Sequence, residues 1–512
     1  MKQDSRPGRI VAVMMAITII GKAMGLLRDR MQAIQFGADT AESIAFGHAS
    51  VLPRSFLDIM FAAAFSASFI PVFSMYLETK GKRAAFDLAA LFISVTTVLT
   101  VGVTVVAILF AQPIFVISLG AGTEFPYGTV QLGTTLLRLM LPLMVLSGLA
   151  FSFTGILQAL GEFRIPAAMS IVSNGVILVY YFFFIDRFGV YGLAVAFLIG
   201  WGMQGAIQLP FLIRNKFRFR FRIDFKDPGL RKIGKLALPV MAGTWVLPVN
   251  LLVNARAAAG LYGGEFGVNA IYFANSLFMI TSGVFILSVS NVIFPKLARE
   301  AIAKDMKGFS ITVNETVLVL LFFLLPLTFG LMGISAPLIA LIHGGGQFGE
   351  TAVHITGIAL FYFAPGVVGY GLMILLSRAC FALMDGRTPV IAAVVAIVTN
   401  AVLSFALAPH MEVAGPALAN AIGQTLGAVV LAVALTRKGV MQWPGRAVLS
   451  IVKMVAIAAI MFATVYVTHA YTAEMHTILQ VVVPTAVGGV VYLGLAMVLR
   501  LKQMWWFFGR AR

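Results

Sequence analysis

The chain has 512 residues, of which 60% are hydrophobic and only 11% are charged, and its formal net charge is +17. So few charged residues cannot cover a water-soluble protein of this length, and the composition therefore predicts an all-α polytopic membrane protein. The single cysteine, Cys380, excludes a disulfide framework and a thiolate metal site. No cleavable signal peptide is expected, because the apolar run behind the basic start is too long.

Apolar stretches of about 20 residues or more follow one another along the whole chain. Fourteen are expected to span the membrane, over residues 10–36, 44–77, 84–112, 127–160, 165–185, 190–213, 233–261, 267–295, 308–332, 351–384, 388–408, 413–436, 447–470 and 476–499. Two shorter apolar pieces, Pro113–Leu119 and Pro337–Ile342, are expected to lie along the outer interface.

The loops between these stretches alternate in charge. Loops after even-numbered stretches carry basic clusters such as Lys80, Lys82 and Arg83, whereas loops after odd-numbered stretches carry acids and one cation, Arg187. The positive-inside rule then places both termini in the cytoplasm. The basic excess is explained by this topology and by attraction to anionic phospholipids, so no nucleic-acid partner is expected.

An internal repeat divides the chain. The stretch Ala159–Pro166 resembles Ala382–Pro389, 223 residues later, and the same offset pairs five small or apolar residues, Val190, Gly192, Ala194, Ala196 and Gly200 with Val413, Gly415, Ala417, Ala419 and Gly423. We therefore expect two parallel six-helix lobes, 1–213 and 233–438, as in alternating-access transporters. A basic cytoplasmic linker, 214–232, joins them, and two extra helices lie in 439–512.

Basic and aromatic residues alternate at the start of this linker, from Lys216 to Arg222. This pattern is typical of a segment that lies on the cytoplasmic headgroups, with Phe inward and Arg on phosphate. A regulatory role, or a role in binding a substrate phosphate, is the alternative.

Five charged residues lie within the first two apolar stretches: Lys22, Arg28, Asp29, Arg54 and Asp58. With a rise of about 1.5 Å per residue, Lys22 lies about 18 Å into its helix, near the middle of a bilayer. A charge at that depth costs at least about 3 kcal/mol, so such side chains normally face a polar cavity. Two acids do not balance three cations, and the surplus favours an anionic ligand. The alternative is that these charges neutralise one another between packed helices.

Other residues in the apolar stretches suggest further features. Arg256, in the seventh stretch, has no nearby carboxylate and is expected to face the same cleft. Gly21 and Gly25 form a G-x-x-x-G that predicts the close approach of another helix. Pro53, directly before Arg54, predicts a kink. Intramembrane amides are interpreted as contacts between helices: Asn174, Asn254, Asn291, Asn400 and Asn420.

The chain lacks the common catalytic motifs. It contains no H-E-x-x-H, no G-x-S-x-G and no Walker loop, so neither an enzyme nor a cofactor is expected. Without a nucleotide site, uphill transport would be coupled to the membrane potential or to a monovalent cation.

Several motifs resemble those of one family. They are Gly25-Leu26-Leu27-Arg28-Asp29, Phe36-Gly37-Ala38, Leu52-Pro53, Ala64-Phe65-Ser66, Phe69-Ile70-Pro71, Gly386-Arg387-Thr388-Pro389 and Ile271-Tyr272-Phe273-Ala274. Together they resemble the MurJ (MviN) family of lipid II flippases, of the multidrug/oligosaccharidyl-lipid/polysaccharide exporter superfamily. The resemblance implies fourteen spans, a cleft for the pyrophosphate and sugar headgroup, and a groove for the polyprenyl tail formed by the last two helices.

The resemblance also carries over residue by residue. The family's arginine–aspartate pair in the first helix corresponds to Arg28 and Asp29, and an earlier arginine corresponds to Lys22. The family's arginine and glutamate in the second helix fall at Leu57 and Ala62. Arg54 and Asp58 lie one turn or less away and are the candidate substitutes.

In the second lobe the match is looser. The family's arginine in the eighth span falls at Ser276, and Arg256 is the candidate replacement. The resemblance implies a sodium ion at this place, which some relatives hold through acids. The matching positions in this chain, Asn254, Asn400, Ser404 and Asn420, lack a carboxylate and are weak candidates for a metal site.

The sequence thus predicts an alternating-access flippase in the bacterial cytoplasmic membrane that moves an undecaprenyl-pyrophosphate-linked peptidoglycan precursor, lipid II, to the outer leaflet for cell-wall synthesis. The candidate substrate-binding residues are Lys22, Arg28, Asp29, Arg54, Asp58 and Arg256. The expected partners are this lipid or a related polyprenyl-pyrophosphate lipid, anionic phospholipids and the wall-synthesis machinery. Two alternatives stay open: an exporter of another anionic polyprenyl-linked glycolipid or polysaccharide, and a non-transporting scaffold of a wall-synthesis complex.

Overall fold

The computed structural model describes the chain except for residues 1–6, 38–39, 65–67, 120–127, 245, 260, 262–265, 443–444 and 507–512. In parts of some helices, including residues 54–64, it describes the backbone but not the side chains. Secondary structure in the described residues is helical, apart from one isolated bridge between Gly345 and Phe348. The predicted all-α fold is confirmed.

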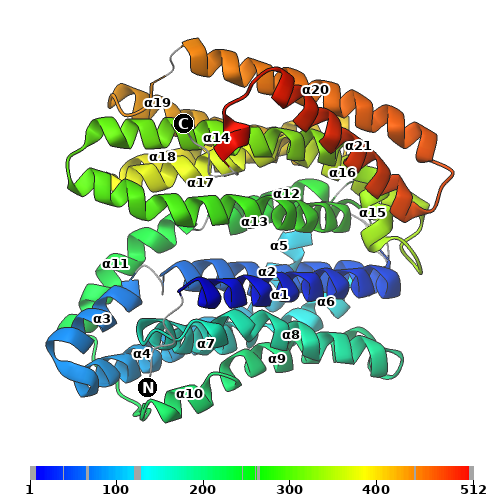
Figure 1. The fold of residues 1–512 in the computed structure, drawn as a ribbon. Coiled ribbons are helices and arrows are strands. Elements are labelled where there is room, and N and C mark those ends of the chain that lie inside the picture. Colours follow the sequence, from blue (N-terminus) through cyan, green and yellow to red (C-terminus); the bar gives the residue numbers. More distant parts are fainter. Residues whose placement is uncertain are drawn as a thin grey trace. The chain divides into compact units, whose positions relative to one another are not determined.

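The helices follow the apolar stretches in chain order (Figure 1). The first twelve are α1 (Pro7–Phe36), α2 (Ala41–Ala64), α3 (Ile70–Thr79), α4 (Gly81–Leu109), α5 (Ala111–Leu119), α6 (Thr129–Met140), α7 (Leu143–Ala159), α8 (Arg164–Phe183), α9 (Ile185–Ala206), α10 (Leu209–Arg214), α11 (Pro228–Thr244) and α12 (Val246–Ala258). The others are α13 (Phe266–Ile302), α14 (Met306–Gly333), α15 (Ser335–His343), α16 (Glu350–Phe363), α17 (Gly366–Ala382), α18 (Arg387–Met411), α19 (Ala414–Arg437), α20 (Gly445–Thr472), α21 (Thr477–Val498) and α22 (Gln503–Trp506).

Each predicted span contains one of these helices or a broken pair of them. Among the described residues, nine helices are long and apolar enough to cross a membrane, or ten if the bent pair α16 and α17 is one span. The two short apolar pieces form separate short helices, α5 and α15, as their length predicts.

The chain forms two compact units, Met1–Pro248 (the N-terminal unit) and Val249–Arg512 (the C-terminal unit). The sequence interpretation starts the second lobe at residue 233, whereas α11 packs on α2, α3 and α4 of the N-terminal unit (Figure 1). Apolar packing explains this, because Ile233 joins a buried cluster with Tyr76 and Phe86. Gly229 also lies so close to Tyr76 that an added Cβ would be 2.8 Å from the phenol oxygen.

The backbone carries the 223-residue offset found in the sequence. Four pairs of residues at this offset have positive φ, where the chain must leave one helix and enter the next. They are Gly81 and Lys304 (81° and 56°), Gly161 and Met384 (84° and 61°), Gly189 and Glu412 (52° and 52°), and Lys216 and Gly439 (63° and 70°). The two copies thus share their turns even where the residue types differ.

Helix breaks and close contacts also follow the offset. Pro142 lies in the break between α6 and α7, and Pro365 lies in the break between α16 and α17, where the chain bends by 44°. Proline lacks an amide hydrogen and clashes with the preceding turn, which explains a break at both places. An added Cβ would lie 3.0 Å from Ser173 O at Gly200 and 2.6 Å from Ala396 O at Gly423, so equivalent helices approach closely in both units.

Candidate functional site

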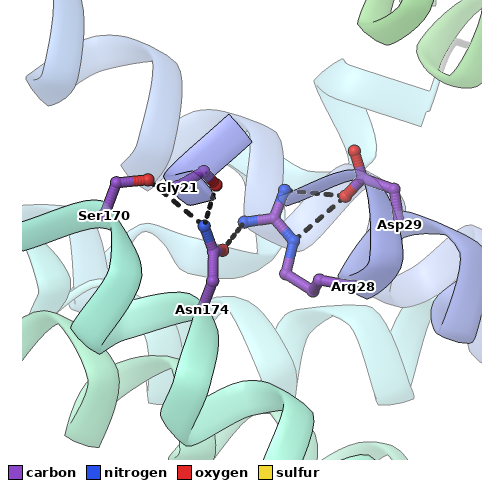
Figure 2. Close-up of polar contacts among 5 residues, drawn as sticks. All are labelled: Gly21, Arg28, Asp29, Ser170 and Asn174. Atoms are coloured by element: carbon purple, nitrogen blue, oxygen red, sulfur yellow. Dashed lines mark hydrogen bonds and ion pairs between the residues drawn. The ribbon is translucent and has the colours of Figure 1, made fainter. Parts of the chain in front are cut away.

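A buried ion pair lies in the C-terminal third of α1. The Arg28 guanidinium donates to Asp29 Oδ1 from Nε (3.0 Å) and from Nη2 (2.7 Å), as Figure 2 shows. Arg28 is 8% exposed and Asp29 is 2% exposed. The pair offsets the cost of burying either charge alone, which explains how both are tolerated in the interior of the unit.

Asn174 of α8 joins this pair to the rest of the unit. Its Oδ1 accepts from Arg28 Nη1 (2.9 Å), and its Nδ2 donates to Gly21 O and Ser170 Oγ at 3.2 Å each (Figure 2). The arginine is therefore held from both sides, by a carboxylate on its own helix and by an amide on a neighbouring helix. The interpretation of Asn174 as a contact between helices is confirmed.

The G-x-x-x-G of α1 makes this contact possible. An added Cβ at Gly21 would lie 3.2 Å from Ser170 Cβ, and one at Gly25 would lie 3.6 Å from Asn174 Nδ2. Because residues four and seven apart share a helix face, Arg28 lies on the same face as the two glycines. The predicted close approach of another helix is confirmed, and the partner is α8.

A cavity of about 370 Å³ lies inside the N-terminal unit next to this network. Its lining comes from α1, α7, α8 and α9 and includes Arg28, Phe151, Ser170, Ser173, Asn174, Trp201 and Gln204. The guanidinium carbon of Arg28 lies 5.8 Å from the ring centroid of Phe197, which stacks on Trp201. The arginine thus contributes to the wall of a cavity within one unit, a position that the sequence did not predict.

The remaining candidate cations differ in their surroundings. Lys22 is half-buried, and no described residue forms a hydrogen bond or ion pair with it. Arg256, in the C-terminal unit, is also partly buried, and its Nη1 has no hydrogen-bond partner among the residues that the structure describes. The backbone of α2 continues through Pro53, but the side chains of Arg54 and Asp58 lie outside the described part.

In the C-terminal unit, a neutral network joins α12 and α18. Asn400 Nδ2 donates to Asn250 Oδ1 (3.1 Å), and Ser404 Oγ lies 3.1 Å from Asn254 Oδ1 and 3.3 Å from Asn400 Oδ1. All four residues are buried, as is Asn420 on α19. The amide oxygen of Asn250 thus accepts from Asn400, and the oxygens of Asn254 and Asn400 share the single hydroxyl hydrogen of Ser404.

This network does not fit a metal ion. Within the described ranges, no group of three or more His, Cys, Asp or Glu residues is close enough to hold one. Hard cations such as calcium take six to eight oxygen ligands in proteins, carboxylates among them. We therefore interpret Asn254, Asn400 and Ser404 as contacts between helices; the side chain of Asn291 lies outside the described residues.

Sequence reasoning missed Trp201 and Gln204. Gln204 is 8% exposed and lines the cavity, yet its side-chain amide forms no hydrogen bond within the described residues. The signal was present, because a glutamine inside an apolar span is a polar group that needs a partner. Only the packing of α9 against α7 and α8 shows that it faces a cavity.

Known proteins match this chain along most of its length. The family model described as Lipid II flippase MurJ matches residues 32–485. A probable lipid II flippase MurJ of Vibrio cholerae serotype O1 is 27% identical over 460 residues, which cover 88% of this chain and 86% of the relative. The probable lipid II flippase MurJ of Rhizobium meliloti is 26% identical over 464 residues, with 88% and 84% covered.

Solved structures share the fold. A lipid II flippase MurJ in an inward closed conformation superposes with a TM-score of 0.81 at 23% identity, and 95% of this chain and 98% of that chain are covered. An inward-facing multidrug resistance MATE family transporter of the MOP superfamily gives a TM-score of 0.71 at 16% identity, with 83% and 97% covered. Since the family model covers most of the sequence, this chain belongs to the lipid II flippase MurJ family.

Proposed function

We propose that the chain is a lipid II flippase, which moves lipid II by alternating access from the inner to the outer leaflet of the bacterial cytoplasmic membrane for cell-wall synthesis. The observation that supports this most is the buried Arg28–Asp29 pair held by Asn174, in a chain that matches the family model over residues 32–485. A bilayer-spanning helix tolerates such a pair at a cost, which a role in binding a charged substrate explains.

The pyrophosphate of the substrate is the proposed ligand of the buried cations. Lys22 and Nη1 of Arg256 are without partners in the described residues, so positive charge is available in both units. Arg28 is engaged by Asp29 on one side, and a phosphate oxygen that approaches it would compete with the carboxylate for the same donors. Arg54 and Asp58 belong to this proposal by their place in α2 alone.

The linker is proposed to bind anionic phospholipids at the cytoplasmic surface, next to cytoplasmic termini. Phe217 is buried against Phe86, with ring centroids 5.4 Å apart, whereas Phe219 and Phe221 are 51% and 65% exposed. The backbone amide of Arg222 donates to Ser94 Oγ (3.1 Å), which fixes the segment at its other end. A segment that is held at both ends and exposes aromatic and basic side chains is suited to contact with lipid headgroups.

The last two long helices, α20 and α21, are proposed to bind the polyprenyl tail. They pack closely, since an added Cβ at Gly488 would lie 2.5 Å from a Val465 methyl carbon. Many of their apolar side chains stay exposed, including Val452, Tyr466 and Val490 at 58%, 65% and 73%. We propose the membrane potential as the driving force, because basic charge would move with the transport cycle.

Complementation of a flippase-depleted bacterial strain tests the proposal. The chain is expected to restore growth, and Arg28→Ala is expected to abolish this while the protein still accumulates in the membrane. Normal growth with Arg28→Ala, and with Lys22 and Arg256 also neutralised, would instead support the scaffold. Native mass spectrometry separates the other alternative, because a lipid II flippase retains lipid II in preference to other polyprenyl-linked lipids.

A further inference from the structure

Among the residues that the structure describes, the cavity inside the N-terminal unit has a polar lining in which the one charge is neutralised. Arg28 is the charged residue among those that line it, and Asp29 neutralises this arginine at 2.7 Å. Asp29 is itself 2% exposed and lies directly beside the cavity wall. A free anion would bring an unbalanced negative charge next to this carboxylate, and an organic cation would meet the guanidinium. The charge balance therefore favours an uncharged polar ligand.

The side-chain amide of Gln204, on α9, opens onto the cavity. Gln204 is more than nine-tenths buried, and its amide offers two N–H donors and one oxygen acceptor with no partner in the described chain. Because the amide opens onto the cavity, its donors and its acceptor are available to a ligand that enters there. Ser173 adds a hydroxyl whose contacts, to Met169 O and Ser170 O, use its hydrogen and leave its lone pairs as acceptors.

Aromatic rings complete the lining. Trp201 stacks on Phe197 with ring centroids 5.5 Å apart and an interplanar angle of 14°, which holds the indole in place. Phe151 of α7 is only half-buried, so part of its ring faces open space. Sugars present C–H groups on one face and hydroxyls around the edge, and a site that combines aromatic faces with amides and hydroxyls fits both. The cavity, at about 370 Å³, is small for a whole headgroup but large enough for a sugar ring.

We propose that this cavity is a carbohydrate subsite that takes one uncharged sugar ring of the lipid-linked headgroup, with Gln204 and Ser173 as hydrogen-bonding residues and Phe151 and Trp201 as ring contacts. The inference rests on the proposed function, since a sugar reaches this place only as part of a transported lipid. The sugar then lies in the cavity beside the Arg28–Asp29 pair, while the pyrophosphate binds Lys22 outside the lining and reaches Arg28 only by competing with Asp29 for its donors.

Native mass spectrometry of the purified full chain in detergent tests the subsite. The probes are undecaprenyl pyrophosphate, the same lipid with a single N-acetylglucosamine, and lipid II. Gln204→Met, which keeps the length of the side chain but removes its amide, is expected to weaken both sugar-bearing lipids about tenfold, because hydrogen bonds to the sugar are lost. Binding of undecaprenyl pyrophosphate should change less than twofold.

The matched control is Gln424→Met. Gln424 lies on α19, the counterpart of α9 in the repeat, and is likewise buried without a partner in the described residues, but it does not line the cavity. Phe151→Leu provides a second variant, judged by the same ratio, if Gln204→Met fails to fold as judged by its thermal unfolding. Equal losses for all three lipids, or none, would overturn the subsite.

The two proposals fail in different ways in this experiment. If the wild-type chain prefers the single-sugar lipid to lipid II, the assignment of lipid II as substrate is wrong while the effect of Gln204→Met still decides the subsite. If the wild-type chain retains bare undecaprenyl pyrophosphate as well as either sugar-bearing lipid, the carbohydrate subsite is wrong while pyrophosphate binding stands.

Discussion

The two units use the same pair of helices for their buried polar contacts, but with different chemistry. In the N-terminal unit, α1 and α8 are joined through Arg28, Asp29 and Asn174. In the C-terminal unit, their counterparts α12 and α18 are joined by amides and a hydroxyl, Asn250 to Asn400 and Asn254 to Ser404. A neutral network is enough to fix two helices in lipid, so the fold does not require the ion pair. On the proposed function, we expect the charge in the N-terminal unit to serve the ligand, and the comparison between the two units provides a test of this.

The largest expected effect comes from breaking the ion pair on one side. Arg28→Ala removes the arginine that neutralises the buried Asp29, which should destabilise the protein by about 3–5 kcal/mol in addition to abolishing transport. The double variant Arg28→Leu/Asp29→Leu removes both charges and should recover much of the thermal stability in detergent. It should still fail to complement a flippase-depleted strain. Recovery of growth by the double variant would mean that the pair is a packing device, as in the C-terminal unit.

A smaller effect is expected from the neutral network. Ser404→Ala removes the hydroxyl hydrogen that Asn254 and Asn400 share and should lower the free energy of unfolding by about 0.6 kcal/mol, a typical value for a hydrogen bond between membrane helices. Complementation should remain close to that of the wild type. Thermal unfolding and growth, measured on the same variant, distinguish a structural role from a role in transport. Loss of growth without loss of stability would assign this network a role in transport.

The sequence was informative where a single residue type is energetically unfavourable in its surroundings or has a distinctive spacing. Arg28 and Asp29 stood out because a charge in an apolar stretch requires a reason, and Gly21 and Gly25 predicted a close helix contact through their spacing alone. The matching turns, such as Gly161 and Met384, follow from the repeat in the same way. These features depend on local chemistry and periodicity.

Other features depend on how distant helices pack, which no local pattern encodes. The cavity exists because α1, α7, α8 and α9 leave space beside Asn174. Gln204 is a candidate ligand-binding residue only because this packing places it in the cavity lining. The assignment of α11 to the N-terminal unit likewise depends on where Phe217 and Ile233 find apolar partners. An apolar span is equally consistent with several neighbours until its packing is known.

The equivalent turns that follow α7 and α17 differ in their ion pairing. Asp385 accepts hydrogen bonds from Lys438 Nζ, from the Thr388 hydroxyl and from the Thr388 amide, whereas Glu162 in the other unit accepts from the Arg164 amide. Partial burial opposes ionisation of Asp385, but the hydrogen bonds from Lys438 and Thr388 outweigh it and hold its pKa below the usual value. Asp385→Asn should therefore cost about 1 kcal/mol at neutral pH, since Lys438 is partly exposed.

The pH dependence of this effect has a definite sign. Because the folded-state pKa of Asp385 is lowered, its ionised form stabilises the fold at any pH above the unfolded value of about 3.9, and this contribution is lost as the pH falls through the folded value. The difference in thermal unfolding between the wild type and Asp385→Asn should be constant near neutrality and shrink below about pH 4. Glu162→Gln is the control and should show a smaller difference. A gap between wild type and Asp385→Asn that widens on acidification would contradict the assignment.

A similarly small effect concerns the backbone of the same two turns. Gly161 and Met384 occupy equivalent positions with φ of 84° and 61°, a region that glycine adopts freely and a side chain does not. Met384 is 94% exposed, so its side chain contributes almost no packing that would be lost. Met384→Gly should therefore stabilise the C-terminal unit by about 0.5–1 kcal/mol. Gly161→Met should destabilise the N-terminal unit by a similar amount. No atom lies within 4 Å of an added Cβ at Gly161, so backbone strain is the whole cost and no steric clash is added. Thermal unfolding of both variants measures the exchange, and a change of the same sign in both would show that the two turns are not equivalent.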